Sequence, residues 1–335
     1  MNPTVLELCA GGGGQALGLE SAGFGSVGVV EIDAQCCETL RLNRSDWNVI
    51  ETDLKTFDGS GFRGVDLVAG GVPCPPFSVA GKQLGRSDER DLFPEAIRVA
   101  RETRPRAVLL ENVPGFASAK FRDYREWLVG ELRSLGFESF TRVLNASNFG
   151  VPQLRPRFVL VALRPEWAGF FEWPDESARR RTVGAALVDL MSSNGWKGAV
   201  PWSSRANDIA PTVVGGSKKH GGPDLGPTRA KRQWRELAVD GLGIANDPPA
   251  ATFPVDGLPR LTNRMVARVQ GFPDSWIFSG RKTAAYRQIG NAFPPPVSRA
   301  VGGSVLRALC REARTTPGRD ASGQLRWLGM EKATH

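Results

Sequence analysis

The sequence predicts an α/β protein with a doubly wound, mostly parallel sheet and a second, smaller, irregular domain. Through residue 163, short β-rich apolar runs alternate with segments whose apolar residues follow helical spacing. This alternation is typical of a sheet covered by helices on both faces. Residues 164–259 are instead rich in Gly, Pro, Trp, Ser and Arg, with few long periodic runs. The change in pattern marks the expected border between the two domains.

The regular elements follow one another at short intervals. Strands are predicted at 4–9, 27–31, 48–50, 65–69, 107–110, 139–144 and 158–163, and helices at 15–22, 34–43, 92–102 and 124–135. After the irregular region, a short helix from Leu261, a turn at 271–273 and a helix from Pro296 to about Arg314 return to regular structure. The expected domains are thus 1–163 and 164–259. Residues 260–314 are expected to contribute to both domains, with the last helix packed on the first domain. Residues 315–335 are expected to form a polar tail.

The amino-acid composition excludes several classes of protein and of active site. The 335 residues are 41 % hydrophobic and 23 % charged, as in globular proteins. The sequence has neither a membrane-length apolar run nor a secretory signal, so a cytoplasmic protein is expected. Five cysteines, none in a CxxC pair, argue against a disulfide framework and fit a reducing compartment. With only two histidines, a multi-histidine metal site or a Ser/His/Asp triad is not expected. No metal is predicted.

Positive charge is concentrated late in the chain. The net charge is +8, and residues 260–335 carry 13 basic and 4 acidic residues. Within 215–235 a basic cluster is opposed only by Asp224 and comprises Lys218, Lys219, Arg229, Lys231, Arg232 and Arg235. Such a distribution favours a polyanion partner, although a solvated basic surface is the simpler alternative.

A glycine-rich turn follows the first strand. Gly11 to Gly14 lie between a strand and a helix, where the backbone can approach a ligand at a helix N-terminus. Glu31 ends the second strand, the usual place for a carboxylate that binds ribose hydroxyls. Asp53 ends the third strand and could accept from an adenine amino group or cap a turn. These residues predict a nucleoside-containing cofactor but do not separate NAD from S-adenosylmethionine, and a turn without a ligand remains the alternative.

Three further strand ends carry reactive side chains. Cys74 lies in a stiff, Pro-flanked turn, which suits a nucleophile better than a core cysteine. Glu111 ends a neighbouring strand, where a carboxylic acid could protonate a ring nitrogen or cap the turn. Gln153, Arg155 and Arg157 point to one side, and the two guanidiniums suit a phosphate or a carbonyl oxygen, or only form a basic edge.

Together and in this order, these motifs resemble the DNA (cytosine-5) methyltransferases of bacterial restriction–modification systems. The resemblance covers residues 4 to about 163 and 260 to about 305. It rests on the following blocks: residues 7–14, Glu31-Ile32-Asp33, Asp53, residues 73–78, Glu111-Asn112-Val113, Gln153-x-Arg155-x-Arg157, residues 260–273 and Tyr286 to Ala292. The chain departs from the common pattern at Cys9, where the family usually has Phe, and at Pro75, where it often has Gln.

The resemblance implies a mechanism on a flipped-out cytosine in duplex DNA. It implies that Cys74 attacks C6, that Glu111 protonates N3, that Arg157 holds O2, and that Arg155 supports this arrangement or a phosphate. It further implies S-adenosylmethionine as methyl donor. The cofactor-binding residues would be Cys9, Ala10, Gly11, Gly13, Gly14, Glu31 on the ribose, Ile32, Asp53 on the adenine amine, Leu54, Pro73, Asn291 and Ala292.

Residues 164–259 stand where the family has its target-recognition region. DNA contacts are expected from Ser78, Lys82 and Arg86, in a loop predicted to close over the DNA, and from Lys218, Lys219, Arg229, Lys231 and Arg232. A monomer that acts near the nucleoid is expected, with a cognate restriction endonuclease acting on the same site without a stable complex. The alternatives are a tRNA-modifying relative, whose Cys-Phe-Thr run is missing here, a catalytically silent DNA-binding relative, and a nicotinamide oxidoreductase.

Overall fold

Seven strands form one twisted sheet in the computed structural model, which describes residues 2–73, 91–176, 180–216, 222–311, 318–319 and 325–326. The sheet order is β3-β2-β1-β4-β5-β7-β6. Strands β1 to β5 are parallel, whereas β7 runs antiparallel to both β5 and β6. The strands are β1 Thr4–Leu8, β2 Gly25–Glu31, β3 Val49–Glu51, β4 Leu67–Gly70, β5 Ala107–Asn112, β6 Glu138–Asn145 and β7 Pro156–Leu163. The chain winds outward from β1 in one direction and then from β4 in the other, so β1 and β4 flank the point where the strand order reverses.

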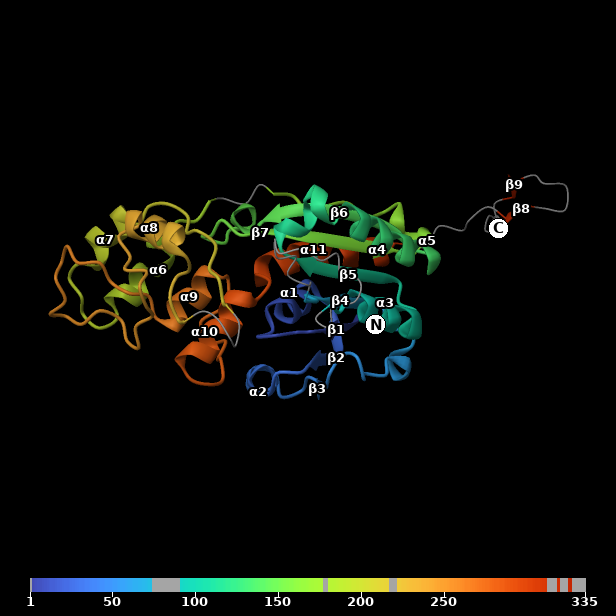
Figure 1. Cartoon of the computed structure of the whole chain (residues 1–335), viewed down its shortest axis with the longest axis horizontal. Coiled ribbons are helices and arrows are strands. Elements are labelled where there is room, and N and C mark those ends of the chain that lie inside the picture. The colour runs from blue at the N-terminus through green and yellow to red at the C-terminus, as the bar shows by residue number, and fades with distance from the viewer. Residues whose placement is uncertain are drawn as a thin grey trace, which may run out of the picture.

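Helices cover both faces of this sheet. These helices are α1 Gly14–Ala22, α2 Ala34–Asn43, α3 Phe93–Thr103, α4 Arg122–Ser134, α5 Pro165–Ala168 and α11 Pro295–Leu309. The apolar side chains of α3 and α4 pack with one set of inward-facing strand residues, and those of α1 and α11 pack with the opposite set. Helix α11 lies against α1 so closely that a Cβ at Gly18 would come within 2.4 Å of the Ser298 side chain. Helix α11, which comes late in the sequence, thus completes the helical layer that α1 begins on this face of the sheet (Figure 1).

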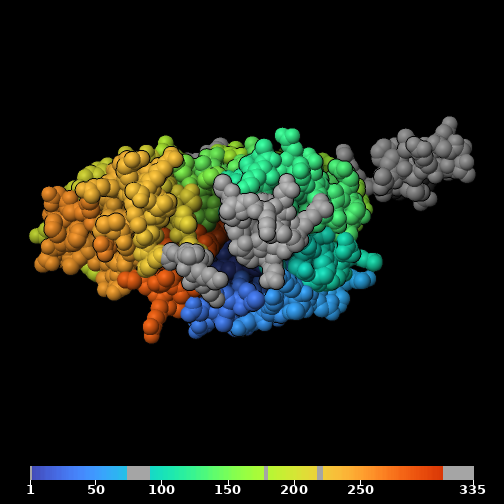
Figure 2. Space-filling view, in the orientation of Figure 1, coloured from blue at the N-terminus to red at the C-terminus, as the bar shows by residue number. Residues whose placement is uncertain are grey.

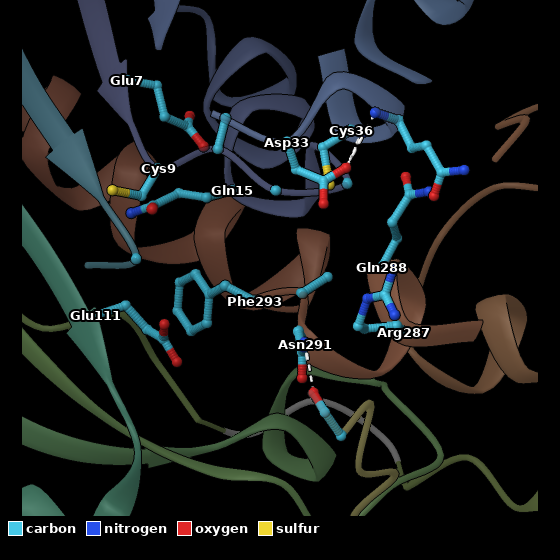
Figure 3. Close-up of a pocket in the computed structure, with 17 residues that line it drawn as sticks. Glu7, Cys9, Gln15, Asp33, Cys36, Glu111, Arg287, Gln288, Asn291 and Phe293 are labelled. Carbon is cyan, nitrogen blue, oxygen red and sulfur yellow. Dashed lines mark hydrogen bonds between the residues drawn. The ribbon is translucent and has the colours of Figure 1, made fainter. Parts of the chain in front are cut away.

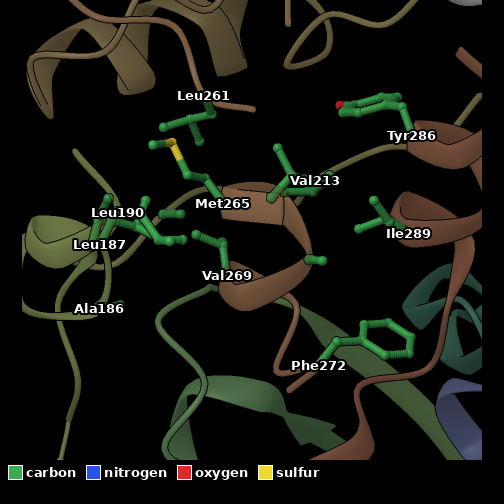
Figure 4. Packing of buried hydrophobic residues seen from close by; sticks show 14 of the residues in the cluster. Ala186, Leu187, Leu190, Val213, Leu261, Met265, Val269, Phe272, Tyr286 and Ile289 are labelled. Carbon is green, nitrogen blue, oxygen red and sulfur yellow. The ribbon is translucent and has the colours of Figure 1, made fainter. Parts of the chain in front are cut away.

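The second part of the molecule is a smaller helical unit at one end of the sheet (Figure 1, Figure 2). Its helices are α6 Val183–Ser192, α7 Ala199–Arg205, α8 Thr228–Glu236, α9 Asn263–Val269 and α10 Lys282–Asn291. Their buried residues form one core, in which Leu187 and Leu190 of α6 face Met265 and Val269 of α9, and Ile289 of α10 lies across from Val213 (Figure 4). Between 164 and 259, the portion that the structure describes contains short helices and irregular chain but no named strand. Two isolated short strands, β8 Gly318–Arg319 and β9 Leu325–Arg326, pair with each other.

The predicted fold class is confirmed: the protein is α/β, with a mostly parallel doubly wound sheet and an irregular second unit. Each predicted strand and helix of the first 163 residues is present, with ends shifted by up to two residues. Two differences occur near the end of the chain. Helix α10 was not predicted, and α11 ends at Leu309, short of the expected Arg314, with Cys310 as its C-cap residue. None of the helices that the structure describes is long and apolar enough to cross a membrane.

Candidate active site

A cavity of about 380 Å³ opens beside the carboxyl ends of β1, β4 and β5. This is the edge of an open α/β sheet at which ligands bind, beside the point where the strand order reverses. Stretches far apart in the sequence line it: mainly the first βα turn, the start of α2, the end of β5 and the end of α10 (Figure 3), with single residues from the chain after β4 and from Gly216. The lining residues are Glu7, Cys9, Ala10, Gly11, Gly12, Gln15, Asp33, Gln35, Cys36, Gly71, Glu111, Gly216, Arg287, Gln288, Asn291, Ala292 and Phe293.

The glycine-rich turn is held in a left-handed backbone path. Gly11 and Gly13 have φ values of 55° and 84°, and Cys9 also has a positive φ of 53°. Side chains rarely adopt such values, which explains the glycines. At Gly13 a Cβ would also lie 2.7 Å from the Trp276 ring, whose Nε1 donates to the Gly12 carbonyl at 3.0 Å. The turn therefore has a fixed shape, with Gly11 and Gly12 facing the cavity.

Glu31 braces the same turn from the end of β2. Its Oε2 accepts from the Gly11 amide at 2.7 Å, and its Oε1 accepts from the amides of Ile32 and Asp33 at 2.9 and 2.8 Å. Glu31 as a whole residue is 8 % exposed. A carboxylate has about four lone-pair positions, so Glu31 keeps accepting capacity for ligand hydroxyls.

Two buried polar side chains that the sequence analysis did not single out reach this cavity. Glu7 on β1 is 1 % exposed and Gln15 on α1 is 3 % exposed. None of their side-chain oxygen and nitrogen atoms has a hydrogen-bond partner among the described residues. Burial raises the pKa of Glu7 well above its ordinary value of 4.5. Because unpaired buried polar atoms are costly, these four atoms indicate a polar ligand in the cavity. The signal available in the sequence was a glutamate among the apolar residues of β1.

The structure brings some predicted cofactor residues together and leaves others apart. Cys9, Ala10, Gly11, Asn291 and Ala292 line the cavity. Gly13 and Gly14 lie behind them, and Glu31 reaches the cavity edge through the Gly11 amide. The remaining predicted residues, Ile32, Asp53, Leu54 and Pro73, are not among the lining residues.

Individual features explain the residues outside the lining. Ile32 is 64 % exposed, whereas Leu54 is buried in the core between the sheet and α3. Asp53 accepts from the Lys55 amide at 3.0 Å, as the capping alternative requires. Ile32 and Asp53 would contact only a ligand that extends past the cavity along the ends of β2 and β3.

Glu111 and Arg157 form a buried ion pair beside the cavity. Arg157 Nε lies 2.7 Å from Glu111 Oε1, across the antiparallel strands β5 and β7. Burial raises the pKa of Glu111, and the positive charges of Arg157 and Arg155 offset part of this rise. A Cβ at Gly71, just after β4, would lie 3.2 Å from Glu111 Oε2. The carboxyl group is thus a protonatable group that faces the segment leading to residue 74.

Arg155, which was expected to support the arrangement around Arg157 or to bind a phosphate, lies in a different environment from Arg157. The side chain is 1 % exposed. Its Nη1 donates to the Val213 carbonyl at 2.7 Å, and its Nη2 donates to the carbonyls of Gly290 and Ala292 at 2.8 and 3.0 Å. With both terminal nitrogens used and almost no solvent access, the side chain fits the supporting role better than a phosphate contact. It ties the strand β7 to the second unit and to the end of α10.

Gln153 and Gln270 extend this buried network. Gln153 accepts from the Val213 amide at 2.8 Å and donates to Gln270, whose Nε2 donates to the carbonyls of Ile289 and Ala292 at 2.9 and 3.2 Å. Both glutamines are fully buried. The network fixes the cavity wall at Ala292 relative to Val213 of the predicted recognition region.

The structure separates the basic residues of α8. Arg229 and Arg232 are exposed, whereas Lys231 Nζ is paired with Asp224 Oδ2 at 2.8 Å. Lys231 is therefore less available for DNA than the two arginines. Several predicted residues, namely the nucleophile Cys74 and the DNA contacts Ser78, Lys82, Arg86, Lys218 and Lys219, lie outside the described residues. Within the described ranges, no group of three or more His, Cys, Asp or Glu residues could hold a metal ion.

Comparison with known proteins connects this geometry to a family. The model of the C-5 cytosine-specific DNA methylase family matches residues 3–307. The chain is 53 % identical to the Type II methyltransferase M.NgoMIV of Neisseria gonorrhoeae, over 93 % of this chain and 100 % of that protein. It is also 53 % identical to the Type II methyltransferase M.NaeI of Lentzea aerocolonigenes, over 94 % of this chain and 77 % of that protein.

Solved structures show the same fold at lower identity. Spodoptera frugiperda DNMT2 superposes with a TM-score of 0.64 and 18 % identity, over 90 % of this chain and 99 % of that one. The chain therefore belongs to the C-5 cytosine-specific DNA methylase family, and it is an enzyme that uses a methyl-donor cofactor to methylate DNA at C5 of cytosine.

Proposed function

We propose that the enzyme transfers a methyl group from S-adenosylmethionine to one flipped-out cytosine in a specific duplex sequence, with Cys74 as the covalent nucleophile. The observation that carries the proposal is the Glu111–Arg157 pair at 2.7 Å, whose Glu111 lines the same cavity as the glycine-rich turn. One cavity thereby combines a protonatable carboxyl group for the base with a turn suited to a nucleoside cofactor.

The described residues fit S-adenosylmethionine. Glu31 at the cavity edge suits its ribose hydroxyls, and the unpaired atoms of Glu7 and Gln15 suit its polar amino-acid end. Asn291 and Ala292 would close the opposite wall. The small Cys9 side chain, where the family usually has Phe, leaves more room beside the cofactor. When bound, the cofactor supplies an electrophilic methyl group.

Each proposed catalytic group has a separate task. The Cys74 thiolate adds to C6, which makes C5 nucleophilic. Glu111 delivers the proton to N3, and burial, which raises its pKa, favours the protonated form that this step needs. Arg157 orients Glu111 through its Nε and holds O2 of the base. After methyl transfer, loss of the C5 proton releases the thiolate.

A trapping experiment tests this mechanism. Fluorine at C5 cannot leave as a cation, so a duplex with 5-fluorocytosine at the mapped target should stay bonded to the enzyme when S-adenosylmethionine is present. The adduct should survive denaturing electrophoresis. It should vanish in Cys74→Ser, because a hydroxyl is a far weaker nucleophile than a thiolate at neutral pH.

Two variants serve as controls. Cys310→Ser removes an exposed thiol at the end of α11, away from the cavity, and should form the adduct normally. Glu111→Gln should form it slowly. An adduct that persists in Cys74→Ser would assign the nucleophile to another cysteine, and trapping by a tRNA substrate in place of DNA would favour the RNA-modifying alternative.

We further propose that residues 164–259 select the target sequence and that the enzyme works as a monomer. The cellular role would be that of the modification enzyme of a cytoplasmic restriction–modification system, close to the nucleoid. Identity with the two Type II methyltransferases supports this role. The exposed Arg229 and Arg232 support DNA contact by the second unit. Replacing 164–259 by the matching region of a relative should change the methylated site while C5 chemistry persists.

A further inference from the structure

Helix α10 belongs to the cofactor cavity and to the recognition region at once. Arg287, Gln288 and Asn291 of this helix line the cavity. The opposite side of α10 packs into the core of the second unit, where Tyr286 and Ile289 face Val213 (Figure 4). A single helix therefore contacts both the proposed cofactor and the proposed DNA-binding unit.

The first contact holds the chain at the start of the segment 216–224. Asn291 Nδ2 donates to the Gly216 carbonyl at 3.2 Å (Figure 3). Next to it, the backbones of Gly215 and Gly290 touch: a Cβ at Gly290 would lie 2.4 Å from the Gly215 nitrogen. A Cβ at Gly215 would lie 2.5 Å from the Arg287 carbonyl oxygen. This approach requires glycine at both positions and fixes Gly216 at the cavity.

The second contact holds the chain at the end of the same segment. Tyr286 is 1 % exposed, and its hydroxyl donates to the Asp224 carbonyl at 2.5 Å. The Asp224 side chain accepts from Lys231 Nζ at 2.8 Å and from the Gly226 amide at 3.0 Å. Tyr286 is thus connected through Asp224 to α8, which presents the exposed Arg232. Both ends of 216–224 are anchored on α10.

We propose that Tyr286 is a positioning residue through which occupancy of the cofactor cavity strengthens DNA binding. The proposal rests on the proposed function. Tyr286 is not among the cavity-lining residues, so it acts through Asp224 and α8 rather than on the cofactor.

The physical basis is shared ordering. A ligand that fills the cavity restrains Asn291 and Gln288, and hence the helix that carries Tyr286. Once α10 is fixed, Gly216, Asp224 and the attached α8 are held in place before DNA arrives. DNA binding then costs less conformational entropy, because these residues are already ordered. The cavity ligand therefore strengthens DNA binding, which is positive coupling between the two ligands. Without the Tyr286 hydroxyl, α10 would keep its hydrogen bond to Gly216 but lose the one to Asp224, so ligand binding in the cavity would no longer restrain α8.

A binding cycle tests this coupling. Fluorescence anisotropy gives the dissociation constant of a duplex carrying the mapped target site, with and without saturating S-adenosylhomocysteine. The wild type should bind DNA at least about fivefold more tightly with the ligand, at the lower end of usual couplings. In Tyr286→Phe, which keeps the buried ring, the ratio should fall at least threefold toward 1. Calorimetry of S-adenosylhomocysteine alone should change by less than about twofold, because the cavity lining is intact.

Thr103→Val is the matched control, because it removes another fully buried hydroxyl that donates to a carbonyl, that of Val99 at 2.8 Å. It should keep the wild-type ratio. An unchanged ratio in Tyr286→Phe, or a wild-type ratio of 1, overturns the proposal. A wild type that binds no S-adenosylhomocysteine overturns both this inference and the proposed cofactor, whereas a normal 5-fluorocytosine adduct with an unchanged ratio overturns this inference alone.

Discussion

The Glu111 carboxylate and the Arg157 guanidinium lie 2.7 Å apart, both about 90 % buried, on adjacent antiparallel strands. Burial raises the pKa of Glu111, and the Arg157 charge works in the opposite direction. The pair therefore sets how firmly Glu111 holds its proton.

Removing the Arg157 charge should change the pH profile of methylation. If Glu111 must deliver a proton, the rate falls as pH rises through the Glu111 pKa. Arg157→Met removes a charge that lowers this pKa, so the alkaline fall should move to higher pH while the maximum rate drops. Single-turnover rates between pH 6 and about 10 measure the shift. Arg142→Met, which removes an exposed arginine of β6, should leave the profile in place; a fall at lower pH in Arg157→Met would contradict the assignment.

Arg155→Met should destabilise the protein without changing the electrostatics of DNA binding. It leaves the buried carbonyls of Val213 and Gly290 without the Arg155 donor, whereas the Ala292 carbonyl keeps its hydrogen bond from Gln270 at 3.2 Å. The free energy of unfolding should fall by roughly 3–5 kcal/mol in urea titrations. Arg307→Met, at an exposed position of α11, should cost less than about 1 kcal/mol. If the folded Arg155→Met protein lost salt dependence of DNA binding, a phosphate contact would be restored as its role.

Arg232→Ala and Lys231→Ala should differ in their effect on DNA binding. Arg232 is exposed, whereas Lys231 is already paired with Asp224. Each lost phosphate contact should lower the slope of log affinity against log salt by about 1. We expect this decrease for Arg232→Ala on all sequences alike, and a smaller change for Lys231→Ala. Loss of affinity only at the preferred site would make Arg232 a base-reading residue.

Glu7→Gln should stabilise the protein free of ligands as pH rises. The folded pKa of Glu7 is raised, so the unfolded chain loses this proton first, and wild-type stability declines above about pH 4.5. Glutamine has no such proton to lose, so the advantage in melting temperature should grow from pH 4.5 toward neutral pH. The same variant should bind S-adenosylhomocysteine more weakly. An advantage that shrinks with rising pH would show that Glu7 is ionised and paired in the folded protein.

Trp276→Phe should weaken cofactor binding by roughly three- to tenfold. The change keeps an aromatic ring over Gly13 but removes the Nε1 donor to the Gly12 carbonyl, which costs about one hydrogen bond. Calorimetry with S-adenosylhomocysteine measures the loss. Trp202→Phe removes another buried indole donor, to the Ala238 carbonyl at 2.9 Å in the second unit, and should leave cofactor affinity unchanged. Equal losses in both variants would mean a general loss of stability.

The sequence was sufficient where local pattern determines structure. Alternating apolar runs located the strands, and the apolar run before Glu111 correctly placed this residue near the carboxyl end of its strand. The hydrogen-bond partners of the Arg155 side chain could not be predicted from the sequence, because the acceptor carbonyls lie 58 to 137 residues away along the chain. Helix α10 was missed because its buried face includes Gln288 and Gly290, which weakens the apolar period. Glu7 resembles any polar residue in a strand until its neighbours in space are known.

The packing of α11 on α1 also has a consequence for synthesis of the protein. Residues 295–309 cover the face of the sheet that α1 shares, so Leu19 and Val5 keep an open apolar surface until that stretch has left the ribosome. Asn291 and Ala292, which close the cavity, emerge only slightly earlier. A nascent chain that ends before α11 therefore has its strands but neither a finished core nor a finished cavity. Methylating activity should begin only after nearly the whole described chain has been made, so an incomplete translation product would be cleared as an unfolded chain rather than modify DNA.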